Sequence, residues 1–255
     1  MELTTINHPY PIMLNLSGRR CLVIGGGAVA ERKVKSLLQA GARVTIVGTE
    51  FTEGLMEMEN KSEVVLYRQT FHPSIMIDES SDFAPYTLVV AATNDAEVNA
   101  HVHEIASRQG QLINVVDQPQ LSSFIAPSVV RRGKLVIAVS TGGASPSAAR
   151  KIAQELDNAY GEEYETYLDF LSDLRLLIQS RVADKQARQR VFKEMLEWDV
   201  LAKIRSGTFE SWKEKLYITL EKEPWMQGQV RDRGTDLSAW LAAIKDIGQQ
   251  VQGGG

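Results

Sequence analysis

The sequence predicts an α/β protein whose first half forms a Rossmann-type parallel sheet. Three observations lead to this prediction. Short apolar segments alternate with helical patterns in the first half, and a glycine-rich turn separates the first such segment from the first helix. In the second half, two apolar segments joined by a short turn are followed by helical patterns alone. Alternating strands and helices are typical of βαβ units, in which the strands run parallel.

Each strand of the expected parallel sheet is a short apolar segment. The first, residues 20–25, is continuously apolar and ends in glycine, as a strand buried on both faces does. Helices are expected at residues 28–40, with Gly41 in the C-cap position, and at 96–109. The other strands are expected at residues 43–47, 63–67, 87–92 and 112–116.

The second half is expected to begin with an antiparallel hairpin of residues 124–130 and 134–140, joined by Arg131-Arg132-Gly133. Helices are then expected after Pro146 and at residues 160–181, 185–196, 209–220 and 237–247. Large aromatic residues of this half are expected to pack against the helices, because large exposed apolar patches are uncommon on monomers. They are Trp198, Phe209, Trp212, Trp225 and Trp240.

The composition excludes several classes of protein. Of 255 residues, 44% are hydrophobic and 24% charged, which argues against disorder, collagen and coiled coil. The net charge of −4 lacks the positive excess of nucleic-acid binders, and the single Cys21 excludes an internal disulfide. We see no signal peptide and no apolar run of the roughly 20 residues that span a membrane, so we expect a soluble, cytoplasmic protein.

The glycine-rich turn is the main functional signal. Residues 25–30 read GGGAVA and fit G-x-G-x-x-A between a strand and a helix. Gly25 would permit the tight turn, Gly27 the approach of backbone N–H groups to a pyrophosphate, and Ala30 close helix–strand packing. The alternative is a glycine-rich turn without a ligand.

The end of the second strand favours NAD over NADP. In this fold an acid at the strand tip binds the adenosine ribose, and a basic residue accepts a 2′-phosphate. The tip here, residues 47–50, has no basic residue, and its acid, Glu50, comes slightly late. Glu50 either reaches the ribose hydroxyls or is an exposed loop acid.

Polar residues follow three further strands. Thr93 and Asn94 either contact the cofactor, or Asn94 or Asp95 caps the next helix. Asp117 ends the fifth strand, which is a catalytic position in such sheets, although Asp is also a common turn former. In the segment 140–146, STGGASP, Ser145 is expected to cap a helix whose open backbone amides attract an anion. Arg150 and Lys151 lie one turn later, and the alternative is an ordinary capped helix with solvated basic residues.

Five motifs occur together and in order, at residues 23–33, 91–95, 114–119, 123–128 and 140–150. With them the chain resembles the precorrin-2 dehydrogenase family over residues 14–196. These are stand-alone enzymes of siroheme synthesis, related to the N-terminal part of bifunctional siroheme synthase. The resemblance implies a Rossmann-type parallel sheet, a small antiparallel dimerisation sheet and a C-terminal helical domain. We place them at residues 1–117, 118–145 and 146–200, followed by a helical extension of unknown role at 201–255.

The resemblance also implies site residues, a reaction and a homodimer whose active-site cleft both chains shape. It implies NAD-dependent oxidation of precorrin-2, a polycarboxylate tetrapyrrole, to sirohydrochlorin. Asp117 matches an essential aspartate that either accepts the proton or holds a pyrrole N–H. Positions matched to cofactor contacts are Ala28, Val29, Thr49 and Glu50, and Ser145 matches a serine of the tetrapyrrole pocket. Basic residues that would pair with the carboxylates are Arg131, Arg132, Lys134, Arg150 and Lys151, although a solvated turn explains the first three equally well.

Two alternative functions remain. Some relatives also insert ferrous iron, but the four histidines, His8, His72, His101 and His103, suggest no metal site, because the last two point to different faces of a helix. A non-catalytic NAD-sensing module would need neither Asp117 nor the segment 140–146. We therefore expect the dehydrogenase alone.

Overall fold

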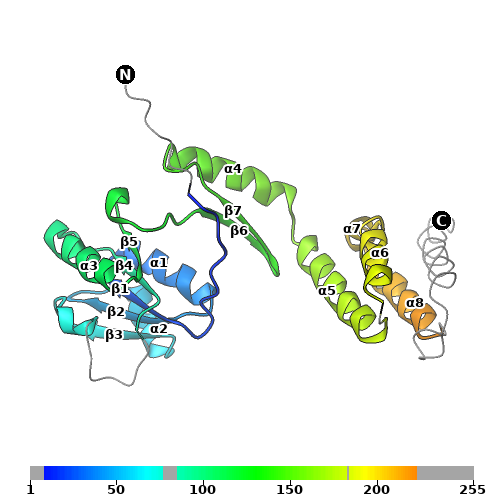
Figure 1. The fold of residues 1–255 in the computed structure, drawn as a ribbon, viewed down its shortest axis with the longest axis horizontal. Helices are drawn as coiled ribbons and strands as arrows, with labels where there is room; N and C mark the ends of the chain where they lie inside the picture. The colour runs from blue at the N-terminus through cyan, green and yellow to red at the C-terminus, as the bar shows by residue number, and fades with distance from the viewer. Residues whose placement is uncertain (1–8, 77–84, 183, 223–255) are drawn as a thin grey trace. The chain divides into compact units, whose positions relative to one another are not determined.

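A five-stranded parallel sheet forms the first part of the computed structural model, which describes residues 9–76, 85–182 and 184–222. The strand order is β3-β2-β1-β4-β5, which confirms the predicted Rossmann-type sheet (Figure 1). Every strand end lies within one residue of its prediction. The strands are β1 (Arg20–Ile24), β2 (Arg43–Gly48), β3 (Val64–Arg68), β4 (Leu88–Ala91) and β5 (Leu112–Val115).

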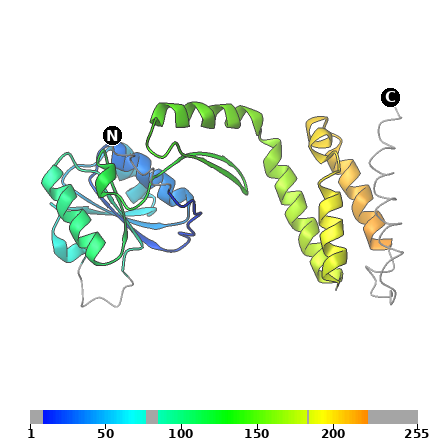
Figure 2. The same ribbon diagram turned by 45° about the horizontal axis from the view of Figure 1, so that its top comes forward.

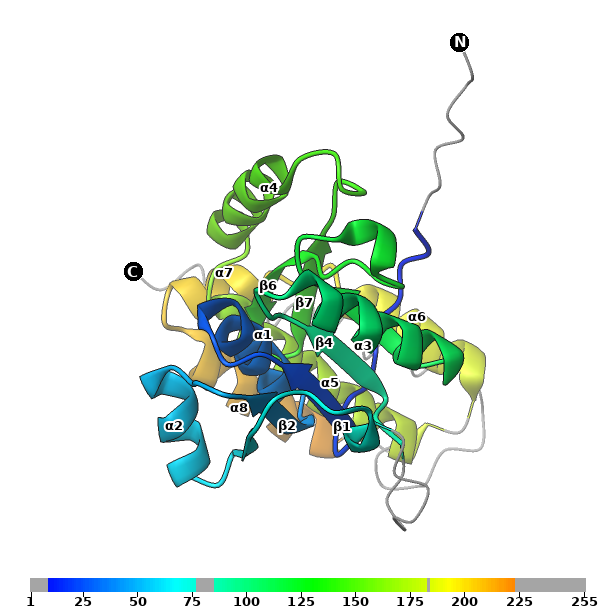
Figure 3. The same cartoon turned by 90° about the vertical axis from the view of Figure 1, so that its left-hand side faces the viewer.

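Helices cover both faces of this sheet (Figure 3). Cys21 and Val23 of β1 point into a core shared with α1 (Ala28–Gln39) and α2 (Glu53–Asn60). Their neighbours Leu22 and Ile24 point into a second core, shared with α3 (Ala96–Arg108). Alternate side chains of a strand point to opposite faces, so a strand buried on both sides is apolar throughout. That explains why these strands appear as continuous apolar segments in the sequence.

Two helices were not predicted, and both are short. The eight-residue α2 buries only Leu55 and Met58 fully, and its N-cap Thr52 accepts a hydrogen bond from the N–H of Leu55 at 3.4 Å. The six-residue α7 (Val200–Arg205) is shorter still and spans fewer than two turns. Too few apolar residues repeat in such helices to give a periodic signal.

The hairpin consists of β6 (Ser128–Arg132) and β7 (Leu135–Val139), paired antiparallel. The predicted turn was wrong: both arginines belong to β6, and the chain turns at Gly133-Lys134, where Gly133 has φ of 51°. The first strand also begins four residues later than predicted. Pro127 has no N–H to donate, and it directly precedes the first paired residue, Ser128.

Helices make up the rest of the described chain: α4 (Pro146–Ala159), α5 (Glu163–Arg181), α6 (Lys185–Met195), α7 and α8 (Phe209–Lys222). In Figure 2, α5, α6 and α8 lie side by side. Trp212 of α8 is 1% exposed, and its ring centroid lies 5.5 Å from that of Phe170 and 5.9 Å from that of Trp198. The predicted packing of Trp198, Phe209 and Trp212 is therefore confirmed. Trp225, Trp240 and the helix expected at 237–247 lie outside the described residues.

The chain divides into two compact units. The first comprises Met1–Pro127 and Ser140–Pro146, and the second comprises Ser128–Val139 and Ser147–Gly255. The hairpin thus belongs with the helices that follow it. Ion pairs inside the second unit join Arg132 to Asp157 and Lys134 to Asp169, each at 2.8 Å. Within the described ranges, no helix is both long and apolar enough to cross a membrane.

We expect Leu174→Ala to destabilise the second unit by about 2–5 kcal/mol, because Leu174 is fully buried among the α5–α8 side chains. The matched control is Leu176→Ala on the same helix. Leu176 is 63% exposed, so its loss should change stability by less than about 0.5 kcal/mol. All four tryptophans belong to this unit, so urea unfolding followed by tryptophan emission reports on it alone. Equal midpoints for the two variants would contradict the assigned core.

Candidate functional site

The first two glycines of the turn are required by close backbone packing. Gly25 has φ of 117°, and a Cβ there would collide with the carbonyl of Ala92 at the end of β4. A Cβ on Gly26 would collide with the carbonyl of Glu50, just beyond β2. These contacts bring the ends of β1, β2 and β4 together at the carboxyl edge of the sheet. Ligands of open α/β sheets bind at this edge.

Gly27 has a different role, because nothing in the fold requires a glycine there. Its φ of −82° suits any residue, and in the described part of the chain no atom beyond its neighbours along the chain lies within 4 Å of the position that its Cβ would take. It is the N-cap of α1, yet no side chain caps that helix. The open space lies in front of backbone N–H groups that carry partial positive charge. This arrangement fits the pyrophosphate of a dinucleotide, which was predicted to lie at Gly25, Gly27, Ala28 and Val29.

Backbone hydrogen bonds hold the end of β2 against the glycine turn. The N–H of Gly25 donates to the Val47 carbonyl at 2.8 Å, and the N–H of Thr52 donates to the Gly26 carbonyl at 3.0 Å. Thr49 and Glu50, between these bonds, are exposed. The structure therefore places both predicted adenosine-side residues beside the glycine turn.

A polar contact that the sequence did not reveal ties α1 to the start of α2. The carboxylate of Glu31, in the first turn of α1, accepts hydrogen bonds from Lys35 Nζ at 2.5 Å and from Thr52 Oγ1 at 2.6 Å. These bonds, with Lys35 contributing most, hold the pKa of the Glu31 carboxyl below its usual range. Glu31 thus fixes the segment after β2 that carries Glu50.

The end of β4 is held by Asn99, a buried residue of α3 that the sequence analysis missed. Its amide Oδ1 accepts from the Thr93 hydroxyl at 2.8 Å, and its Nδ2 donates to the Thr93 carbonyl at 3.0 Å. Asp95 caps α3 by accepting from the N–H groups of Glu97 and Val98, so the cap predicted for Asn94 or Asp95 is supplied by Asp95. Asn94 is exposed and remains a candidate cofactor contact, whereas the Thr93 hydroxyl is used within the loop.

Asp117 lies two residues beyond β5 and has left-handed backbone geometry, with φ of 60°. Its side chain is exposed, and the preceding residue is tied to β4, since the N–H of Val116 donates to the Ala91 carbonyl at 2.9 Å. Because all five strands are parallel, the carboxyl end of β5 lies on the same sheet edge as the glycine turn. Left-handed geometry in a residue other than glycine is uncommon and is often found at functional sites.

The segment 140–146 forms a tight turn before α4. Thr141 Oγ1 accepts from the N–H of Ser145 at 3.0 Å and donates to its carbonyl at 3.1 Å. The helix begins at Pro146, as predicted, so Ser145 occupies the N-cap position. Arg150 and Lys151 of α4 are exposed, and Arg150 contacts the hydroxyl of Ser147 at 3.4 Å.

The hairpin cations differ from these two residues. Arg132 and Lys134 each form an ion pair with a carboxylate of the same unit, at Asp157 and Asp169. Their charges therefore stabilise the unit, and the turn alternative fits them better than a substrate contact does.

The histidines are dispersed. His72 caps the short helix η1 (Pro73–Ile75), and the ring of His101 lies edge-on to Phe71 at 6.0 Å. His103 lies 3.4 Å from the hydroxyl of Ser107, and His8 is outside the described residues. In the described ranges, no group of three His, Cys, Asp or Glu side chains is arranged to hold a metal ion.

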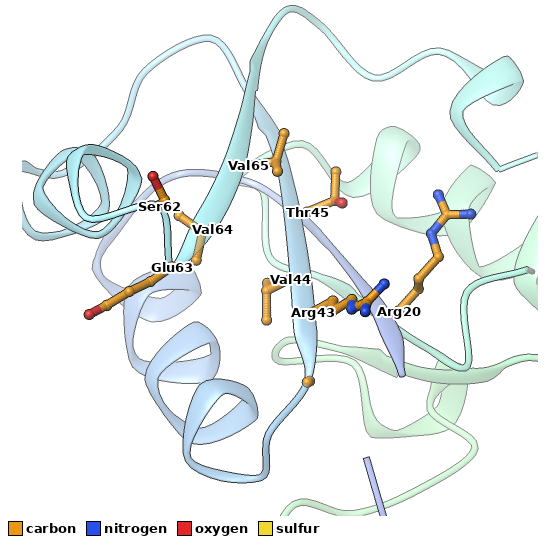
Figure 4. Close-up of a pocket in the computed structure, with 9 residues that line it drawn as sticks. Arg20, Arg43, Val44, Thr45, Ser62, Glu63, Val64 and Val65 are labelled. Atoms are coloured by element: carbon orange, nitrogen blue, oxygen red, sulfur yellow. The ribbon is translucent and has the colours of Figure 1, made fainter. Parts of the chain in front are cut away.

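A pocket of about 330 Å³ lies at the amino ends of the strands, opposite the sheet edge that carries the glycine turn (Figure 4). Arg20, Arg43 and Glu63, from the amino ends of β1–β3, line it together with Thr45 and Val65. The glycine turn lies at the other end of the same strands. The pocket is therefore separate from the dinucleotide site.

Comparison with known proteins agrees with this geometry. A family model described as NAD(P)-binding matches residues 12–128. Siroheme synthase of Nitrosococcus oceani is 35% identical over 211 residues, 83% of this chain and 44% of that protein. Siroheme synthase 2 of Yersinia enterocolitica is 32% identical over 250 residues, 95% of this chain and 50% of that protein. The solved structure of SirC, precorrin-2 dehydrogenase, matches with a TM-score of 0.64 and 25% identity, over 93% of this chain and 100% of that chain.

The chain is thus similar to siroheme synthases and to the precorrin-2 dehydrogenase SirC. The fold of the chain, a parallel sheet with a two-stranded sheet and C-terminal helices, is similar to that of SirC. The matched NAD(P)-binding model covers most of the first unit, which agrees with the open space at Gly27. The chain spans about half the length of the curated relatives that it matches.

We expect Gly27→Val to abolish NAD binding while the first unit stays folded. The valine fits the backbone geometry and meets no protein atom, but its methyl groups fill the space for the pyrophosphate. Calorimetric titration with NAD and a thermal melt of the same sample test this. Gly25→Ala is the contrasting variant, since its Cβ meets the Ala92 carbonyl and should lower the melting temperature. Unchanged NAD affinity in Gly27→Val would rule out this loop as the cofactor site.

Proposed function

We propose that the chain catalyses the NAD-dependent oxidation of precorrin-2 to sirohydrochlorin. The observation that carries the proposal is the position of Asp117. Asp117 follows β5 by two residues, has left-handed backbone geometry and is exposed. It lies at the carboxyl edge of the sheet, where the glycine turn leaves room for a dinucleotide. The similarity to SirC, precorrin-2 dehydrogenase, and to siroheme synthases supports the choice of substrate.

The reaction removes a hydride and a proton from precorrin-2. NAD held at the glycine turn would supply the hydride acceptor. The carboxylate of Asp117 either accepts the proton or holds a pyrrole N–H so that the reacting carbon faces the cofactor. Ser145, Arg150 and Lys151 bind the substrate, the two cations through its carboxylates. Thr49 and Glu50, with the exposed Asn94, bind the cofactor beside the glycine turn.

We also propose that β6 and β7 are a dimerisation sheet and that the enzyme is a homodimer. Val129 of β6 is 43% exposed, and a two-stranded sheet is seldom stable without a partner surface. A second copy of the hairpin would cover such residues.

The assay for this function is NADH formation on mixing the protein with precorrin-2 and either NAD or NADP. We expect faster initial rates with NAD at equal cofactor concentration, because the β2 tip has no cation and Glu50 would repel a 2′-phosphate. Absence of NADH from a sample that binds NAD would refute the proposed reaction. Equal or faster rates with NADP would refute the cofactor preference alone.

We expect Asp117→Gly and Asp117→Asn to bind NAD normally but to lower the rate of NADH formation by about 10²–10⁴-fold. Glycine accepts the φ of 60° without strain, so that variant removes the carboxylate while preserving the turn. Asparagine tolerates the same geometry and keeps an oxygen that can accept a pyrrole N–H, but it cannot take a proton. Partial activity in Asp117→Asn would identify the holding role, and full activity in Asp117→Gly would show that Asp117 only forms the turn.

A further inference from the structure

The loop that presents Asp117 closes on the hydroxyl group of Ser122. We propose that Ser122 is a positioning residue, which holds the turn so that the Asp117 carboxylate faces the substrate. The inference rests on the proposed function, because it assigns Ser122 a part in that reaction.

The contacts of Ser122 lie on both sides of Asp117. Its Oγ accepts the N–H of Val115, the last residue of β5, at 2.9 Å. The same Oγ lies 3.2 Å from the Val115 carbonyl and 3.3 Å from the Gln118 carbonyl, to either of which its proton is donated. The Gln118 N–H in turn donates to the Val115 carbonyl at 3.3 Å. One hydroxyl therefore joins the residues that bracket the turn.

The conformation of Asp117 explains why the hydrogen bonds of Ser122 are needed. Its φ of 60° is disfavoured for a residue with a Cβ, so the surrounding structure must maintain it. The carboxylate itself is exposed and is not packed in place by apolar neighbours. The bond from Val116 to Ala91 holds the chain before Asp117, and the hydrogen bonds of Ser122 to Val115 and Gln118 hold the turn on both sides of it.

The neighbouring Ser123 provides a matched control, because it makes the same kind of contact at a different place. Its Oγ accepts the N–H of Ile113 at 2.9 Å and lies 3.3 Å from the Ile113 carbonyl. Both serines thus supply partners for the outer edge of β5. Ser122 differs in that its Oγ also lies 3.3 Å from the carbonyl of Gln118, the residue directly after Asp117.

The decisive comparison is between Ser122→Ala and Ser123→Ala. Each loses hydrogen bonds to β5, so we expect similar reductions in melting temperature, of about 2–4 °C. Only Ser122→Ala should lower kcat, by about 10–100-fold, with the KM for NAD unchanged, because a small displacement of a reacting group has a large effect on rate. Equal losses of kcat in the two variants, or no loss in Ser122→Ala, would overturn the proposal.

A double variant tests whether Ser122 acts through Asp117. In the Asp117→Gly background no carboxylate remains to be positioned, so adding Ser122→Ala should leave kcat unchanged. A further loss equal to that seen in the wild-type background would show that Ser122 affects catalysis by another route, which contradicts the assigned role.

Amide hydrogen exchange separates this inference from the proposed function. We expect exchange at the Gln118 N–H to accelerate at least tenfold in Ser122→Ala and to stay unchanged in Ser123→Ala, in the NAD-bound protein. This readout needs no turnover. If the wild type forms no NADH, the proposed function fails, whereas the exchange rates still decide whether Ser122 holds the turn. Equal exchange rates at the Gln118 N–H in the two variants would refute the proposal that Ser122 holds the turn, even if the enzyme is active.

Discussion

The close approach of three chain segments at Gly25 and Gly26 is the constraint on which the dinucleotide site depends. The Ala92 carbonyl occupies the place of a Cβ on the first glycine, and the Glu50 carbonyl that of a Cβ on the second. Because both carbonyls follow neighbouring strands, the contacts set where β2 and β4 end relative to β1. The start of α1, the residues beyond β2 and the Thr93–Asn94 segment are thereby brought to one edge of the sheet. Gly27, which meets no such contact, leaves that edge open to a ligand.

The backbone groups on the outer edge of β5 are satisfied by the segment that follows this strand. An edge strand presents backbone groups that would pair with another chain. Ser122 and Ser123 bind the N–H groups of Val115 and Ile113, and Asn114 donates from Nδ2 to the Phe124 carbonyl at 3.3 Å. Side chains of the following segment thus replace a sixth strand. Phe124, whose carbonyl accepts the Asn114 bond, was expected to begin the hairpin but belongs to this segment.

The sequence predicts features that depend on local patterns and misses those that depend on distant contacts. The strands of the sheet, the glycine turn, the cap by Asp95 and the start of α4 follow from neighbouring residues, and the structure agrees with them. Asn99 and Thr141 showed no such signal, because an Asn within a helix and a Thr in a turn are ordinary. Their importance appears only when the chain brings Asn99 back to Thr93, and Thr141 to Ser145. The left-handed geometry of Asp117 likewise follows from the loop that closes around it.

The basic residues of the second unit differ in the partners that they already have. Arg132 and Lys134 have carboxylate partners at 2.8 Å, and binding a substrate carboxylate would require breaking an existing ion pair. Arg150 contacts a neutral hydroxyl, which leaves its full charge for an anion. A hydrogen bond between a guanidinium and a carboxylate is stronger than one between a guanidinium and a neutral hydroxyl. Arg150 would therefore gain by leaving the Ser147 hydroxyl and binding a substrate carboxylate. The same exchange gains little at Arg132, and this difference supports the proposal that α4, in preference to the hairpin, binds the substrate.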